Sequence, residues 1–158
     1  MPTSRVVPAG PVVVDATLLI DVIRGGNAAK RFTRVLSRAE VTSVNFGEVL
    51  YKLGMADSLA PDEVEAALTA TGLSVVSVNL GVSRRFLELK QIDERSRAAQ
   101  RRAGATSPKS LSLADIVCLG YAAETGYPVL TADRHWTTLG KHGLTVAVFD
   151  YRNPKTTL

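Results

Sequence analysis

The sequence predicts an α/β domain in which a central parallel sheet lies between layers of helices. Its 158 residues, 46% hydrophobic and 22% charged, are typical of one soluble globular domain with a sizeable core. Short apolar runs rich in β-branched residues alternate with longer segments whose apolar residues recur every three or four positions. Because parallel strands need crossover connections, which are usually helices, this alternation favours a parallel sheet. No internal repeat and no second domain is evident.

Five apolar runs predict the strands. The first, Val12-Val13-Val14, is wholly β-branched and ends at Asp15, which indicates a buried strand. The five predicted strands are residues 12–15, 41–44, 73–78, 128–131 and 144–149.

Six segments between these runs show helical spacing. In one of them Phe32, Val35, Leu36 and Ala39 follow the i, i+3, i+4, i+7 pattern of an amphipathic helix. Pro61 suits the first turn of another, because its missing N–H has no partner there in any case. The predicted helices are residues 17–23, 27–39, 46–53, 64–71, 82–102 and 113–120.

The two ends of the chain carry no such pattern. Residues 1–11 contain three prolines and are expected to be a flexible leader, residues 12–150 form the domain, and residues 151–158 are a C-terminal tail. No apolar run approaches the about 20 residues that span a bilayer, and no secretory signal is evident. The single cysteine, Cys118, excludes an internal disulfide, so we expect a cytoplasmic protein that does not enter a membrane.

The formal net charge of +4 is unevenly distributed. Residues 24–38 and residues 84–110 each carry a net charge of +5, so the rest of the chain is net acidic. Two basic segments and a separate acidic group suit a nucleic-acid partner. Two solvated helix faces explain the same charges equally well.

Four acidic residues fall where a parallel α/β fold binds its ligands, beyond the carboxyl ends of the strands. Asp15 ends the first predicted strand, and Asp133 follows the fourth. Glu48 lies one turn into the helix entered from the second strand, and Asp115 opens the helix before the fourth. Carboxylates gathered in one crevice repel each other unless a cation neutralises them, and an all-oxygen site suits Mg²⁺ or Mn²⁺.

Each acid also has a purely local interpretation. Asp15 can cap the helix that follows it, and Asp115 can form a capping box with the serine three residues before it. Asp133 can be a turn residue, and Glu48 can pair with Lys52 one helical turn later. For any one acid alone the local interpretation is the stronger, whereas the four together favour a shared site.

Two other kinds of site are disfavoured. Cys118, His135 and His142 lack the spacing of a zinc site. No Gly-rich phosphate loop is present, because Gly25-Gly26 is not followed by Gly-Lys-Ser/Thr and no GxGxxG follows a strand.

Four short motifs contain the acids. They are Val-Val-Asp15-Ala-Thr17, Ser43-x-x-x-x-Glu48, Leu111-Ser112-Leu113-Ala114-Asp115 and Leu130-Thr131-Ala132-Asp133. In this order, over roughly residues 12–150, they resemble a PIN domain, and they are most similar to the VapC-type ribonuclease toxins of bacterial toxin–antitoxin pairs. The resemblance implies a three-layer α/β/α fold with a central parallel sheet. Residues 95–110 are longer and more basic, and the leader is longer, than the family pattern.

The resemblance also implies an activity. It implies a Mg²⁺- or Mn²⁺-dependent endoribonuclease that commonly dimerises and is held by a small VapB-like antitoxin. The metal-binding, catalytic acids would be Asp15, Glu48, Asp115 and Asp133, with auxiliary hydroxyl groups at Thr17 and Thr131.

The basic segments offer contacts to the RNA backbone. These contacts would be electrostatic and independent of base sequence. The candidate residues are Arg31, Arg34, Arg101 and Arg102.

Two other functions remain open from the sequence. An aspartate phosphatase or a phospho-accepting receiver domain also has an acid at the end of a strand. The phosphatase pattern has a second acid where this chain has Thr17, and the receiver needs a late lysine, for which only Lys141 is nearby. The other alternative is a PIN-like module that binds RNA or a partner and cuts nothing.

Overall fold

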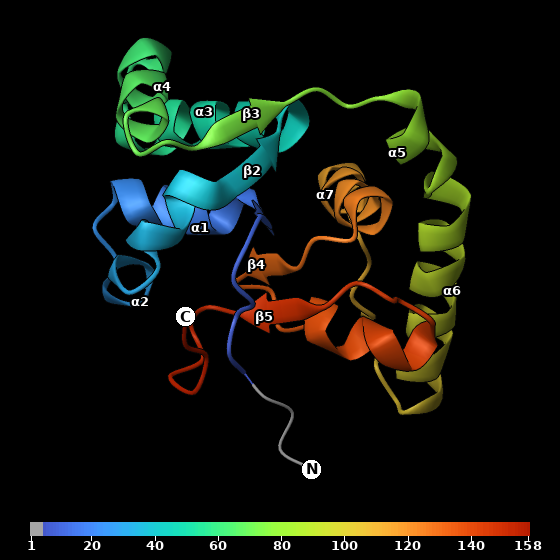
Figure 1. The fold of residues 1–158 in the computed structure, drawn as a ribbon. Helices are drawn as coiled ribbons and strands as arrows, with labels where there is room; N and C mark the ends of the chain where they lie inside the picture. Colours follow the sequence, from blue (N-terminus) through green and yellow to red (C-terminus); the bar gives the residue numbers. More distant parts are fainter. Residues whose placement is uncertain (1–4) are drawn as a thin grey trace.

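The computed structural model describes residues 5–158, which form a five-stranded parallel sheet in the order β3-β2-β1-β4-β5 (Figure 1). Val12 pairs with Ala39 on one side of β1, and Val14 pairs with Leu130 on the other. The strands are β1 (Val12–Val14), β2 (Ala39–Thr42), β3 (Ser74–Val76), β4 (Val129–Thr131) and β5 (Val148–Asp150).

Helices cover both faces of the sheet, which confirms the predicted three-layer α/β/α fold. Val12 and Val14 face a core shared with α1, α3 and α4, whereas Val13 faces a second core shared with α6 and α7. Successive residues of a strand point to opposite faces, so the short β1 run serves both cores. The helices are α1 (Ala16–Ile23), α2 (Asn27–Lys30), α3 (Ser43–Asp57), α4 (Pro61–Thr69), α5 (Leu80–Arg84), α6 (Phe86–Arg102) and α7 (Leu113–Thr125), with 3-10 helices η1 (Thr33–Arg38) and η2 (Trp136–His142). No helix in residues 5–158 is long and apolar enough to cross a membrane.

The helix expected over residues 27–39 is instead two short pieces, α2 and η1. Phe32, Val35 and Leu36 are fully buried, as their spacing predicts. Because a 3-10 helix also places residues i and i+3 on one side, the spacing does not distinguish it from an α-helix. The helix expected over residues 82–102 likewise divides at Arg85 into α5 and α6.

The ends of the chain differ from the expected leader and tail. Val7 is buried, and its N–H donates to the carbonyl oxygen of Thr157 over 2.8 Å. Val6 pairs with Thr157 in a parallel bridge, and the N–H of Thr157 donates to the carbonyl oxygen of Arg5, so residues 5–7 lie against the end of the chain. Residues 1–4 of the predicted leader lie outside the described residues. Tyr151 and Thr156 are also buried, so residues 151–158 belong to the domain.

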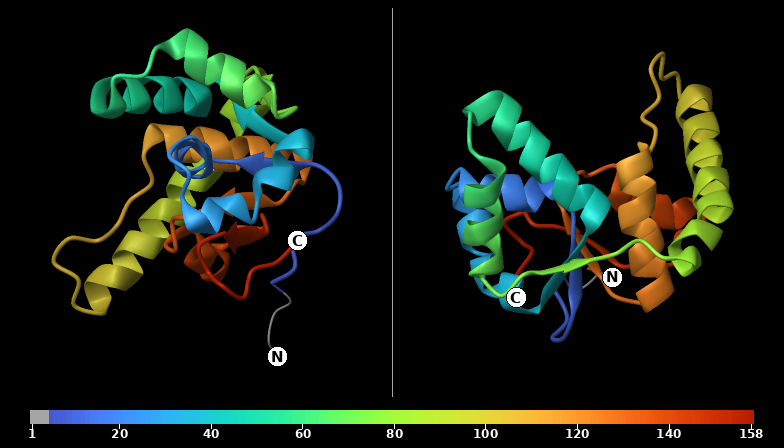
Figure 2. Two further views of the ribbon diagram at one scale, coloured as in Figure 1. Left: turned by 90° about the vertical axis from the view of Figure 1, so that its left-hand side faces the viewer. Right: turned by 90° about the horizontal axis from the view of Figure 1, so that it is seen from above.

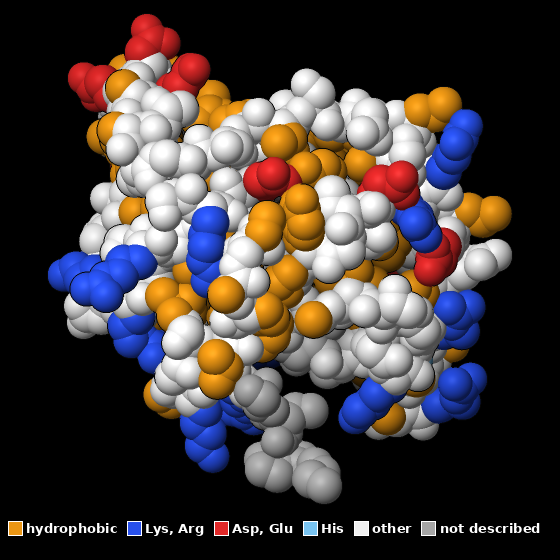
Figure 3. All heavy atoms as spheres, in the orientation of Figure 1, with side chains coloured by type: hydrophobic (Ala, Val, Ile, Leu, Met, Phe, Trp, Pro, Cys, Tyr) orange, Lys and Arg blue, Asp and Glu red, His pale blue; other side chains and the backbone are white. Residues whose placement is uncertain are grey.

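Because the sheet is parallel, all its strands end at one edge, the carboxyl edge, and begin at the other, the amino edge. The loop from residue 103 to residue 112 joins α6 to α7 and projects beyond the rest of the chain in both views of Figure 2. On the face shown in Figure 3, acidic side chains gather over α4, and Lys and Arg side chains gather over α2 and along α6. The four predicted acids follow or approach the carboxyl ends of the strands.

Candidate active site

Asp15 lies at the carboxyl end of β1, next to the end of β4. It is 5% exposed, and its Oδ1 accepts hydrogen bonds from Thr17 Oγ1 at 2.6 Å and from the N–H of Leu18 at 3.4 Å. Its Oδ2 accepts a bond from Thr131 Oγ1 at 2.6 Å. Burial, with the nearby charge of Asp115, raises the pKa of Asp15 to about 6, against the two threonine bonds, which lower it.

The two threonine hydroxyls also hold the backbone that follows β4. Thr131 Oγ1 accepts the N–H of Asp133 at 3.0 Å, and Thr17 Oγ1 accepts the N–H of Ala132 at 3.2 Å. Asp133 in turn accepts the N–H of His135 at 2.8 Å through Oδ1. This network fixes Asp15 and Asp133 on neighbouring strand ends.

Asp115 sits in the first turn of α7 and completes a capping box with Ser112. Its Oδ2 accepts the N–H of Ser112 at 2.8 Å, and its own N–H donates to Ser112 Oγ at 3.1 Å. Burial raises the pKa of Asp115, and the charges of Asp133 and Glu48 raise it further, against the bonds from Ser112.

Glu48 is brought towards Asp115 by the start of α3. Asn45 Nδ2 donates to the carbonyl oxygen of Ala114 over 3.1 Å, which ties the first turns of α3 and α7 together. The Glu48 carboxylate forms an ion pair with Lys52 at 2.6 Å. The bond to Glu48 raises the pKa of Lys52.

The local interpretation of every acid is therefore correct, and it does not exclude a shared site. Asp15 caps α1, Asp115 forms a capping box, Asp133 holds a turn and Glu48 pairs with Lys52. These contacts fix where each carboxylate points. Among residues 5–158, Lys52 is the one cation that forms an ion pair with any of the four acids.

The donor atoms fit a hard divalent cation by their chemistry. Around Asp15 they are carboxylate and hydroxyl oxygens, the ligands that such a cation prefers. Within residues 5–158 no three His, Cys, Asp or Glu side chains are close enough to hold an ion as they stand.

A cavity of about 450 Å³ opens beside Asp133. Basic residues from three segments share its wall with the acid and with Thr17. Its lining consists of Thr17, Lys109, Ala132, Asp133, Arg134 and Arg152.

The arginines selected from the sequence lie in different places. The Arg31 guanidinium donates to four carbonyl oxygens of residues 151–156, at 3.0 to 3.5 Å, which gives it a structural role. Arg34 lies in η1, which leads into the amino end of β2, so the structure does not bring it to the acids. Arg101 and Arg102 are exposed at the end of α6, directly before the projecting loop.

Sequence reasoning missed two buried acids. Asp150 directly follows the apolar part of β5, as Asp15 follows that of β1, and the same rule could have selected it. Asp93 of α6 is fully buried and accepts the N–H of Leu111 at 2.9 Å. Because Leu111 precedes the cap of α7, Asp93 helps to set the position of Asp115. Nothing in its sequence context distinguishes it from an exposed helical acid.

Cys118 lies behind the acids, in the middle of α7. It is fully buried, with Sγ 4.0 Å from the carbonyl oxygen of Val14. Burial raises the pKa of the thiol well above its usual range, and the charge of Asp15 adds to the effect.

Known proteins share this fold. A sequence model of the PIN domain matches residues 12–141. No curated protein sequence matched the chain. Among solved structures, the fold is similar to a toxin–antitoxin complex from Klebsiella pneumoniae, at 16% identity over 80% of this chain and 91% of that chain, with a TM-score of 0.61.

Two further structures are similar to the same extent. DNA-bound VapBC from Salmonella typhimurium is 18% identical over 90% of this chain and 98% of that chain, with a TM-score of 0.60. VapC20 from Mycobacterium tuberculosis, a sarcin–ricin loop cleaving toxin, is 17% identical over 85% and 96%, with a TM-score of 0.59. The structural likeness shows the fold, and the sequence match covers most of the chain. The chain therefore belongs to the PIN domain family.

Proposed function

We propose that this protein is a metal-dependent endoribonuclease and the toxin of a type II toxin–antitoxin pair. The observation that carries the proposal is the position of the four acids in a PIN fold: Asp15, Glu48, Asp115 and Asp133 follow or approach the carboxyl ends of the strands. Burial is the main cause of the raised pKa of both Asp15 and Asp115; the charge of Asp115 adds to the first shift, and the charges of Asp133 and Glu48 add to the second. Retaining such repulsion in a folded protein is costly unless a ligand cation relieves it.

The cation would be Mg²⁺ or Mn²⁺, held by Asp15, Asp115 and Asp133, with Glu48 for a second ion or for the attacking water. Such an ion, when bound, polarises a phosphate oxygen and makes water nucleophilic near neutral pH. The chain itself contributes the orientation of the ligands. Thr17 and Thr131 each donate a hydrogen bond to Asp15, so they stabilise its ionised form and hold both of its oxygens in place.

Asp115→Asn separates metal chemistry from helix capping. Asparagine keeps a carbonyl oxygen for the N–H of Ser112 but removes one negative charge. We expect RNA cleavage with Mn²⁺ to fall on the order of 100-fold or more, because outer contacts to a metal alone are worth 10- to 100-fold. Thermal stability without metal should be unchanged or higher, since repulsion is relieved, and the stabilisation by Mn²⁺ should be lost.

The measurement is cleavage of labelled single-stranded RNA, with thermal unfolding in EDTA and in Mn²⁺. Asp62→Asn, on the exposed first turn of α4, is the matched control and should leave cleavage intact. Full cleavage by Asp115→Asn would contradict the proposed site.

One observation favours a non-catalytic PIN module as the second candidate. No three candidate ligands are gathered closely enough to hold an ion as they stand in the described part of the chain. A module of this kind would bind RNA in EDTA and would gain no stability from Mn²⁺. Stabilisation of the wild type by Mn²⁺, lost in Asp115→Asn, distinguishes the nuclease from it. The family match leaves no specific support for a phospho-accepting domain.

A VapB-like antitoxin is the proposed partner. The similar structures from Klebsiella pneumoniae and Salmonella typhimurium are toxin–antitoxin complexes. The acids at the carboxyl edge offer an Arg or Lys of such a partner a charge-assisted contact that would compete with the metal. Expression of this chain alone should arrest growth, and co-expression of the small protein encoded beside it should restore growth. Normal growth without that protein would contradict the toxin role. A homodimer, to be measured by light scattering, belongs to the same proposal.

A further inference from the structure

We propose that Lys109, Arg134 and Arg152 form a phosphate-binding site, which holds the backbone of a single RNA strand beside Asp133. The inference rests on the proposed ribonuclease function and adds to it the residues that bind the substrate. These three cations replace Arg31 and Arg34 as the main candidates for RNA contact.

The cavity beside Asp133 is the starting observation. Of its six lining residues three are cationic and one is acidic, so its wall is net positive although it borders the acid cluster. The three cations come from separate segments: the loop before α7, the turn after β4 and the turn after β5. A polyanion approaching the carboxylates would be repelled by them, and flanking cations offset that repulsion.

Arg152 is held in place before any ligand binds. Its guanidinium donates to Asp21 Oδ2 from Nη2 at 2.7 Å and from Nε at 3.2 Å, and it lies over the ring of Tyr151 at 5.7 Å. Its side chain is still 51% exposed, so part of the guanidinium faces solvent. A pre-oriented arginine loses less side-chain entropy when it binds a phosphate.

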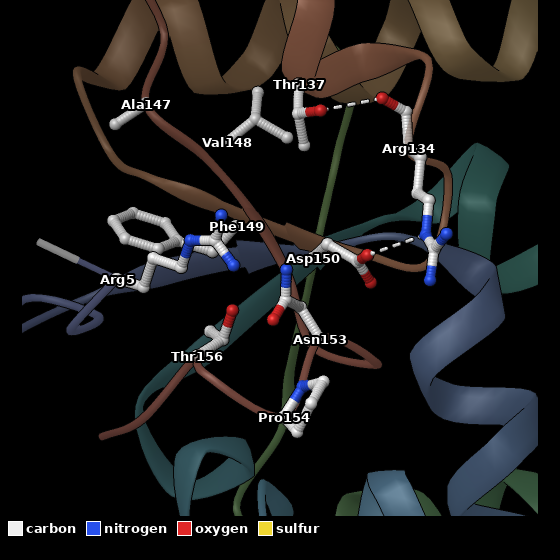
Figure 4. A pocket seen from close by; sticks show the side chains of 10 residues that line it. All are labelled: Arg5, Arg134, Thr137, Ala147, Val148, Phe149, Asp150, Asn153, Pro154 and Thr156. Atoms are coloured by element: carbon white, nitrogen blue, oxygen red, sulfur yellow. Dashed lines mark hydrogen bonds and ion pairs between the residues drawn. The ribbon is translucent and has the colours of Figure 1, made fainter. Parts of the chain in front are cut away.

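Arg134 forms a looser ion pair with Asp150. Its Nε lies 3.4 Å from Asp150 Oδ2, and its side chain is 81% exposed. Figure 4 shows the two side chains pointing toward each other beside a second cavity of about 710 Å³, which Arg5 also lines. Because Arg134 lines both cavities, it can contact a strand that passes from one to the other.

Lys109 is carried by a loop that is fastened on both sides. Its backbone N–H donates to Gln100 Oε1 at 2.8 Å, and its carbonyl oxygen accepts from Gln100 Nε2 at 3.1 Å. Two residues after Lys109, the N–H of Leu111 donates to Asp93. The Lys109 side chain itself is exposed and lines the cavity.

The composition of the cavity also predicts how the strand is recognised. Among residues 5–158 no aromatic side chain lines it, so these residues offer no platform on which a base could stack. Cations without such a platform contact phosphate oxygens and do not read bases. We therefore expect this site to set affinity and position, and the choice of cleavage site to depend on other contacts.

The test is binding of a fluorescent single-stranded RNA in EDTA, where no cleavage occurs, at several salt concentrations. Lys109→Ala and Arg134→Ala should each weaken binding several-fold. Each should also reduce the slope of log affinity against log salt by about 0.7, the value for one phosphate contact on a single strand. Lys90→Ala, on the exposed surface of α6, is the matched control and should change neither quantity. In cleavage assays with Mn²⁺ the two variants should raise KM and leave kcat nearly unchanged.

Failure of the phosphate-binding site and failure of the proposed ribonuclease function would give different results. A wild type that cleaves RNA, with Lys109→Ala and Arg134→Ala binding it as tightly as the wild type, would refute the phosphate site and leave the nuclease intact. Weaker binding by Arg34→Ala alone would also refute it. A wild type that neither binds nor cleaves RNA would instead refute the proposed function. Loss of antitoxin binding without loss of RNA binding would mark the cavity as a protein contact and overturn the proposal.

Discussion

Replacing Asp15 by asparagine should abolish metal-dependent RNA cleavage and, without metal, should not destabilise the protein at neutral pH. Asp15 is buried between Thr17 and Thr131, and its charge has no cationic partner in the described residues. Asparagine has the same size and keeps an oxygen for the cap of α1, where it is about as good as aspartate. We expect cleavage to fall on the order of 100-fold or more, because a ligand oxygen and a negative charge are lost together.

The stability effect has a defined pH dependence. The pKa of Asp15 is about 6 in the folded protein and 3.8 in a free side chain, so the folded state binds the proton more tightly. Folding stability therefore falls as pH rises through this window, by about 2 kcal/mol between pH 4.5 and pH 7 as an order of magnitude. Asp15→Asn lacks this contribution at every pH.

Urea unfolding in EDTA at a series of pH values measures the difference. The wild type should lose more stability than Asp15→Asn between pH 4.5 and pH 7, and the two curves should run parallel above pH 7. The control is Asp62→Asn, whose exposed carboxylate should leave the pH dependence as in the wild type. An identical pH dependence in wild type and Asp15→Asn would show that Asp15 does not carry a raised pKa.

Thr131→Val should have the second-largest effect, although valine has nearly the shape of threonine. Thr131 is fully buried, donates to Asp15 and accepts the N–H of Asp133. Valine leaves that N–H without this acceptor, at a cost of about 1–3 kcal/mol. Since the threonine bond lowers the pKa of Asp15, its loss raises that pKa further. Cleavage should fall about 10- to 100-fold, and its acidic limb should move to higher pH.

Thr131→Ser keeps the hydroxyl and is the matched control for this prediction. It removes one buried methyl group, which costs about 1 kcal/mol, and it should retain most of the cleavage activity. The comparison uses the pH–rate profile with Mn²⁺ for all three proteins. If serine impaired cleavage and valine did not, packing of the methyl group and not the hydroxyl would be the important feature.

The sequence predicts the sheet and its helices well because burial leaves a clear pattern in them. Val12, Val13 and Val14 are consecutive apolar residues, as expected of a strand that is buried on both faces; Val13 faces one core, and Val12 and Val14 face the other. Residues 27–39 show the limit: buried Phe32 and Val35 are three apart, and this spacing fits an α-helix and a 3-10 helix alike. The contact of Val7 with Thr157 could not be predicted for a different reason, since the two residues lie at opposite ends of the sequence.

In the candidate site, too, some features follow from the sequence pattern and others depend on contacts between distant residues. The positions of Asp15 and Asp133 could be predicted because each directly follows a strand, and all strands end at one edge. The basic residues that contact RNA could not be identified from net charge, because nothing in the sequence distinguishes the role of Arg31 from that of Arg152. Their roles depend on long-range partners: Arg31 donates to carbonyl groups of residues 151–156, whereas Arg152 is turned toward the cavity by Asp21.

The buried thiol of Cys118 allows local opening of the protein to be measured by thiol labelling. It is the one sulfhydryl of the chain, it lies directly behind Val14 and the acid cluster, and its raised pKa keeps it protonated. A thiol reagent can therefore modify it only in molecules in which α7 has lifted from β1, so the labelling rate counts such openings. Any ligand that ties α7 to the strand ends should slow labelling, which gives an assay of site occupancy without radioactivity, substrate or turnover.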